Sequence, residues 1–155
     1  MRQQRWFPIA VVAVALFAVN VVARLVIRIG FTDNDKAQDR VSIIMFAVIG
    51  IVLAAVTFVR AQRVAPAQWL PDLAASAVVA MLLTILVGPF ISGDSPFKAG
   101  AGNFFSQVWL YAGFAIVGTL LGYWIATAFG RDYRSRSLKA FAAARTNKPR
   151  RPVRR

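Results

Sequence analysis

The sequence predicts an all-α integral membrane protein: four transmembrane helices in a small bundle, both termini cytoplasmic, and a disordered basic C-terminal tail. Of its 155 residues, 58% are hydrophobic, and they stand in four long blocks with almost no charge inside. Such blocks are typical of membrane-spanning helices. Ten of the 19 Lys and Arg residues lie in the last 25 residues. We therefore expect a transmembrane domain over residues 1–130 and a cytoplasmic tail over residues 131–155.

The first block covers residues 7–29, with Asn20 inside it and Arg24 and Arg28 near its end. Its apolar part, residues 7–23, would be about 25 Å long as a helix, close to the hydrocarbon thickness of a bilayer. A basic start before an apolar run is also typical of signal peptides. However, this run is longer than a signal peptide needs, and arginines stand where a cleavage site would lie. We expect a retained helix.

The second block, residues 41–59, contains no charged side chain and is closed by two arginines. Asp39 precedes it, where an aspartate can accept hydrogen bonds from the first free N–H groups of a helix. The polar stretch before this block also holds Asp33 and Asp35. An EF-hand calcium loop needs a glycine and a distal glutamate that this stretch lacks, so we expect a solvated loop.

The third block, residues 73–91, follows a connector that contains two prolines and a tryptophan. These residues predict an interfacial loop up to residue 71, with Asp72 as the N-cap of the third helix. Gly88 and Pro89 stand near the end of the block. A proline at this position is expected to kink or end the helix, because it has no N–H group and its ring crowds the preceding turn.

The fourth block, residues 104–130, contains the motif Gly118-Thr-Leu-Leu-Gly122. Small residues four positions apart let two helices approach closely in lipid, and the third block has a series with the same spacing. The glycine motif could dock a second chain or a partner, or pack within the chain, for example against the third block. The residues expected to pack helices are Ser76, Ala80, Thr84, Gly88, Gly118, Gly122 and Ala126.

The distribution of Lys and Arg predicts the orientation, because cytoplasmic segments carry the excess. The N-terminus, the loop after the second block and the tail together hold 14, and the opposite side holds five. Both termini are therefore expected in the cytoplasm. Residue usage rich in Arg, Ala, Val and Gly suggests a bacterium, and hence its inner (plasma) membrane. The expected aromatic belts comprise Trp6, Trp69, Tyr123 and Trp124 at the inner interface and Trp109 at the outer one.

Asn20, Arg24 and Arg28 are four residues apart and therefore share one face of the first helix. Polar groups inside a membrane are costly and usually face protein or a wet cavity. One interpretation is a site for an anion or a lipid phosphate, which arginine binds through two parallel hydrogen bonds, or for a partner subunit. In the other, Asn20 pairs with a neighbouring helix while the arginines reach water or the loop aspartates.

The tail is expected to begin as a loosely amphipathic basic segment on the anionic inner leaflet, and residues 146–155 are expected to be disordered. A protein partner is an alternative. Nucleic acid is disfavoured, because the tail offers few aromatic side chains for stacking. The residues expected to contact anionic phospholipid headgroups are Arg131, Arg134, Arg136, Lys139 and Arg145.

The chain has no Cys, no His and no Glu, and its six acidic residues are aspartates. We therefore expect no metal site, no cofactor and no enzymatic activity, since catalysis would rest on Asp, Tyr or Lys alone. The predicted role is an accessory or structural membrane subunit within a larger complex or a homo-oligomer. The alternative is an oligomeric channel or transporter for an anion or a lipid phosphate, with Asn20, Arg24 and Arg28 as its lining.

Overall fold

The computed structural model describes residues 6–30, 35–91, 93, 95, 97 and 100–146. All regular structure in this part of the chain is helical. The predicted all-α class is confirmed, and four stretches are long and apolar enough to cross a membrane. The elements are α1 (Trp6–Gly30), α2 (Asp35–Arg63), α3 (Pro66–Leu82), the π-helical turn η1 (Leu83–Val87), α4 (Gly88–Ile91), α5 (Gly100–Ala128) and α6 (Tyr133–Thr146).

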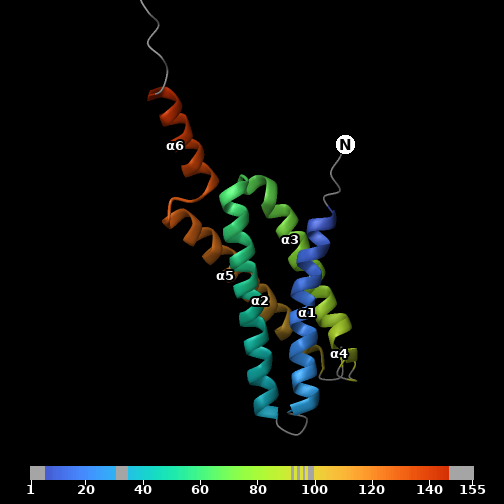
Figure 1. The fold of residues 1–155 in the computed structure, drawn as a ribbon. Coiled ribbons are helices and arrows are strands. Elements are labelled where there is room, and N and C mark those ends of the chain that lie inside the picture. The colour runs from blue at the N-terminus through green and yellow to red at the C-terminus, as the bar shows by residue number, and fades with distance from the viewer. Residues whose placement is uncertain are drawn as a thin grey trace, which may run out of the picture.

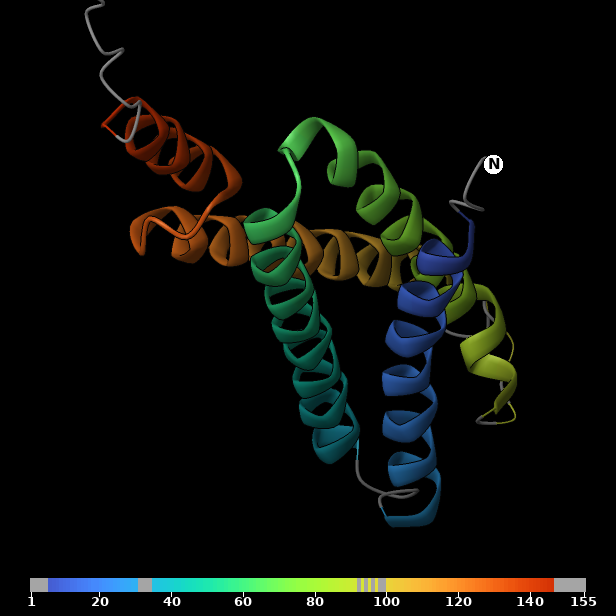
Figure 2. The same cartoon turned by 45° about the horizontal axis from the view of Figure 1, so that its top comes forward.

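The helices form an open bundle in which neighbours along the chain are not always the closest partners. α1 and α2 run antiparallel, while α5 crosses α2 obliquely (Figure 1, Figure 2). The most extensive contacts join α2 to α5 and α1 to α3, whereas α3 and α5 touch over a short length only. The start of α1, the α2–α3 turn and α6 lie at one end of the bundle (Figure 1). We call it the basic end, because Arg60, Arg63 and the basic residues of α6 lie there.

Four small residues allow the closest approach of α2 and α5. A Cβ atom added to Gly118 would lie 2.8 Å from the Cα atom of Gly50, and one added to Gly122 would lie 2.8 Å from the Cα atom of Ala54. Neither position has room for a side chain, because backbone lies directly opposite. The glycine motif therefore packs within the chain, and it packs against α2 rather than against the third span.

Two predicted helix starts are wrong. α2 begins at Asp35 and α3 at Pro66, so Asp39 and Asp72 lie inside helices instead of capping them. The chain reverses between Arg63 and Pro66. Pro66 begins α3, because a proline suits the first position of a helix, where an N–H group would have no partner in the helix. The expected interfacial loop before residue 72 is therefore mostly the first turns of α3.

The third span is kinked but continues past its proline. The backbone N–H of Gly88 donates to the carbonyl of Leu83, five residues back, so one turn is widened to a π-helix. In a regular helix the ring of Pro89 would crowd the carbonyl of Ile85, and a widened turn is a common cause of such kinks. The helix then extends to Ile91 as α4, so the predicted kink occurs without termination.

The end of α5 is set by Gly130, which has a φ of 58°. The N–H of Arg131 donates to the carbonyl of Ala126 (3.0 Å), and that of Gly130 donates to Thr127 (2.9 Å). This pair of bonds is the Schellman ending, which favours glycine because left-handed backbone has no steric cost there. Asp132 then caps the start of α6, since its carboxylate accepts a hydrogen bond from the N–H of Ser135 (3.3 Å).

Candidate functional site

Asn20, Arg24 and Arg28 form a polar stripe along α1 that contacts other helices. Asn20 is fully buried, and its Nδ2 donates to the sulfur of Met45 on α2 (3.1 Å). Arg28 is exposed and donates from Nη1 to the carbonyl of Ile91 at the end of α4 (3.1 Å). The stripe therefore connects α1 to α2 at one level and to the end of the third span at another.

Gly88 allows Asn20 and Arg24 to lie directly against the kinked helix. A Cβ atom at Gly88 would be 2.7 Å from Oδ1 of Asn20 and 2.7 Å from Nε of Arg24. The absence of a side chain at this position thus leaves room for two polar groups of α1. Gly88 also belongs to the series of small residues in the third span, which packs mainly against α1.

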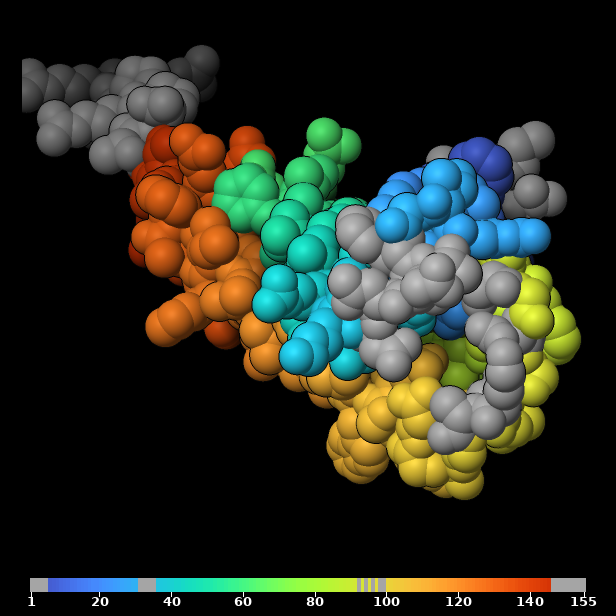
Figure 3. All heavy atoms as spheres, turned by 90° about the horizontal axis from the view of Figure 1, so that it is seen from below, coloured from blue at the N-terminus to red at the C-terminus, as the bar shows by residue number. Residues whose placement is uncertain are grey.

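A polar cavity of about 580 Å³ opens beside the stripe, at the end of the bundle opposite the basic end. It lies between the C-terminal half of α1, the first turns of α2, η1 and the first turns of α5 (Figure 3). Its polar lining residues are Asn20, Arg24, Gln38, Asp39, Ser42, Thr84, Asn103, Ser106 and Gln107. Two other grooves, one between α3 and α5 and one between α1 and α2, are lined almost entirely by apolar side chains.

Two buried groups on the cavity wall have unused hydrogen-bonding capacity. Oδ1 of Asn20 and Oγ1 of Thr84 are buried, with no hydrogen-bond partner among the described residues. The side chains themselves are 0% and 1% exposed. A buried polar group without a partner costs roughly 1–3 kcal/mol. Both residues line the cavity, but the two oxygen atoms are covered by neighbouring atoms, so a ligand would reach them only after the side chains turn.

Among the described residues, the cavity wall carries one charge of each sign. Arg24 supplies the cation from the α1 side, and Asp39 supplies a carboxylate from an exposed position on α2. The Asp39 carboxylate makes no ion pair or hydrogen bond with any described residue. A guanidinium group inside a low-dielectric wall is a strong site for phosphate or carboxylate, which it can hold with two parallel hydrogen bonds.

Sequence reasoning identified only part of this cavity. Asn20 and Arg24 line it, Arg28 does not, and Thr84 was assigned to packing alone. The polar residues of α2 and α5 were not singled out, although their spacing of three or four residues places them on one face of each helix. They are Gln38 and Ser42 on α2 and Asn103, Ser106 and Gln107 on α5.

The other predicted residues are placed as follows. The seven small residues assigned to packing are all buried, and the five basic residues assigned to the leaflet are all exposed. Trp69 is buried with its ring 6.3 Å from that of Tyr123, so it packs inside the bundle instead of anchoring at an interface. The predicted disorder of residues 146–155 falls outside the described residues, apart from the backbone of Thr146, which ends α6.

Within the described ranges, no cluster of three Asp residues could hold a metal ion. Searches of protein-family models, of curated proteins and of solved structures found no match for the chain.

Proposed function

We propose that this multi-pass membrane protein binds a phosphate-type anionic group in the polar cavity, either the headgroup of a lipid or a free phosphate. One observation carries the proposal: Arg24 lines a polar cavity beside two buried groups, on Asn20 and Thr84, that have unused hydrogen-bonding capacity. Arginine supplies the charge, and the amide and the hydroxyl can bind the remaining oxygen atoms of a phosphate.

The depth of the cavity suits a lipid headgroup. Arg24 lies less than two turns before the end of α1 at Gly30, so it is roughly 9 Å below that end. We propose that the basic end faces the cytoplasm, as the distribution of Lys and Arg predicts. The cavity then lies near the outer leaflet of a bacterial inner membrane.

An accessory or structural subunit was the other expectation, supported partly by the small residues of the third and fourth spans. In the structure these residues are buried within the chain, and the two glycines contact α2. They are therefore not free to dock a partner helix. This placement favours ligand binding over partner docking as the main role of the chain.

α6 is proposed to lie on the anionic leaflet at the basic end. Its basic residues are exposed, and so are Tyr133, Leu138 and Phe141. A basic residue near an anionic leaflet adds about 1 kcal/mol. Amide exchange of α6 should therefore be slower in nanodiscs of anionic lipid than in nanodiscs of neutral lipid, and equal exchange would contradict this placement.

Titration calorimetry in neutral maltoside micelles tests the cavity. Phosphate and a short-chain phosphatidate serve as separate probes, so that a free anion and a lipid headgroup are distinguished. Arg24→Gln should raise the dissociation constant at least about tenfold, because a hydrogen bond to a charged group contributes about 1.5–3 kcal/mol. Arg63→Gln, at the basic end, is the matched control and should bind as the wild type does. Equal binding by the wild type and Arg24→Gln, or no binding by either, would refute the proposal.

A further inference from the structure

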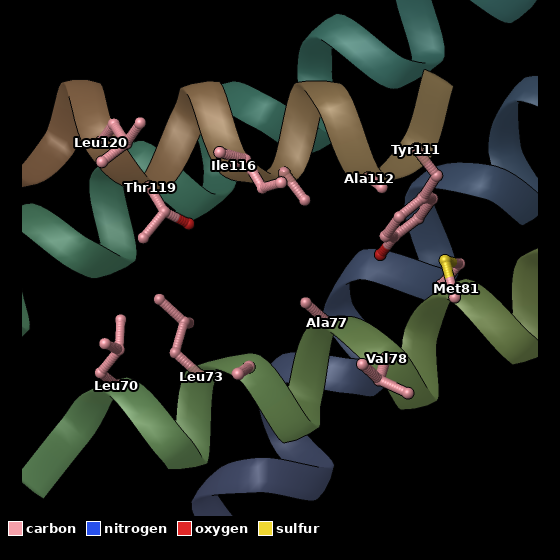
Figure 4. A pocket seen from close by; sticks show the side chains of 12 residues that line it. Leu70, Leu73, Ala77, Val78, Met81, Tyr111, Ala112, Ile116, Thr119 and Leu120 are labelled. Atoms are coloured by element: carbon pink, nitrogen blue, oxygen red, sulfur yellow. The ribbon is translucent and has the colours of Figure 1, made fainter. Parts of the chain in front are cut away.

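An apolar groove of about 420 Å³ separates α3 from α5. Figure 4 shows side chains of the two helices facing each other across an open gap, among them Leu73 and Ala77 from α3 and Ala112 and Ile116 from α5. The groove exists because α5 packs on α2 and leaves α3 after a short contact. Its lining is apolar apart from the hydroxyl groups of Tyr111 and Thr119.

The groove and the polar cavity follow one another along the third span and α5, although no residue lines both. Met81 lines the groove and Thr84 lines the cavity, three residues further along the same helical span. Likewise Tyr111 lines the groove and Gln107 lines the cavity, four residues apart on α5. Residues at these spacings share a helix face. Along these two elements, the polar cavity therefore lies nearer the end of the bundle and the apolar groove nearer its middle.

On α5, Tyr111 is the residue of the groove that lies nearest to the polar cavity in the sequence. Its side chain is 1% exposed, and its hydroxyl has no hydrogen-bond partner in the part of the chain that the structure describes. A buried tyrosine hydroxyl usually has a partner. A polar linkage between a headgroup and an acyl chain would pass this position and could accept its hydrogen bond.

We propose that the groove holds an acyl chain of the same ligand whose phosphate occupies the polar cavity, so that the ligand is a phospholipid. This inference rests on the function proposed above. The order of the two parts, polar near the membrane surface and apolar toward its middle, matches the order of headgroup and chain in one leaflet. A partner helix in the groove would not explain why a polar cavity follows the groove along α5.

Cross-linking tests the position of the chain. The probe is a long-chain phosphatidate with a diazirine on its acyl chain, added to the full-length protein in neutral maltoside micelles, with cross-linked peptides mapped by mass spectrometry. Cross-links are expected in residues 70–81 and 111–120, and unlabelled long-chain phosphatidate should compete them away. Ala112→Phe fills the groove and should reduce them at least about tenfold. Ala55→Phe, on an exposed face of α2 outside the groove, should leave them unchanged.

The outcomes separate this inference from the function on which it rests. If short-chain phosphatidate binds in an Arg24-dependent way but cross-links spread evenly over the lipid-facing helices, the acyl-chain inference is overturned and headgroup binding stands. If neither phosphatidate binds, both fail. If Ala112→Phe instead changes the oligomeric state in native mass spectrometry, the groove is an interface with a second copy, and the inference is overturned.

Discussion

At the scale of single residues, the polar cavity depends on a few positions whose surroundings decide their role. Asn20 is polar in an apolar helix, and it is buried against Met45 and Gly88 while its residue lines the cavity. Asp39 lies on the same cavity but is exposed, so its carboxylate remains solvated. A ligand that carries both phosphate and an ammonium group could pair with Arg24 and Asp39 together.

Asp39→Asn should therefore change which headgroup is preferred. Removing the carboxylate takes a negative charge away from the cavity, so phosphatidate should bind about two- to fivefold more tightly, as expected for an exposed charge interaction. Phosphatidylethanolamine should bind more weakly by a similar factor, because its ammonium group loses a partner. Calorimetry with both lipids measures the change, with Asp72→Asn in α3 as the control. Parallel changes for the two lipids would argue against a role for Asp39 in headgroup choice.

Single residues also show which part of the polar cavity can be predicted from the sequence and which part cannot. Asn20 and Arg24 could be chosen because charge and amide groups are rare in apolar spans. Thr84 could not be separated from Ser76 and Ala80, since all three fit one helical spacing. Only the widened turn at η1 and the course of α5 show that Thr84 reaches a cavity.

At the scale of helices, the apolar blocks predicted the number and type of elements, because membrane-spanning helices need long uncharged runs. The boundaries were less predictable. Pro66 starts α3 and Pro71 lies inside it, although two prolines so close together predict a loop. The sequence also does not show which helices pack together. The second span (Gly50, Ala54) and the third span both have small residues four positions apart, so by spacing either could pack against Gly118 and Gly122.

The α2–α5 contact predicts opposite effects for two glycines of one helix. Gly118→Ala places a Cβ atom against the backbone of Gly50 and should destabilise the protein by about 1–3 kcal/mol, as overpacking does. Gly113→Ala meets nothing within 4 Å and should be neutral or stabilising by up to about 1 kcal/mol, because alanine favours helix. Thermal unfolding in detergent measures both variants. Equal stability of the two would show that α5 does not approach α2 this closely.

At the scale of the whole molecule, the two ends of the bundle differ: most of the exposed basic residues that the structure describes lie at one end, and the polar cavity lies at the other. α6, whose basic residues are exposed, lies at the basic end (Figure 1), and the polar cavity lies at the other end. Two ends of such different character suit a protein with a fixed orientation in the membrane. The orientation itself follows from charge counting alone and can be measured directly.

Cysteine labelling measures the orientation, and the natural chain contains no cysteine to interfere. Ala101→Cys, at the exposed start of α5, should react with a membrane-impermeant maleimide on intact cells. Gln68→Cys, exposed near the α2–α3 turn, should react only after the membrane is opened. The reverse pattern would place the cavity at the cytoplasmic leaflet.

Phosphorus NMR tests the central claim most directly, because it observes the phosphate itself. Short-chain phosphatidate titrated with the wild-type protein in neutral micelles should show a shifted or broadened phosphorus resonance that saturates. The account predicts that Arg24→Gln abolishes this change at the same protein concentration, while Arg63→Gln preserves it. A phosphorus resonance that responds equally to wild type and Arg24→Gln would contradict the claim that Arg24 in the polar cavity binds phosphate.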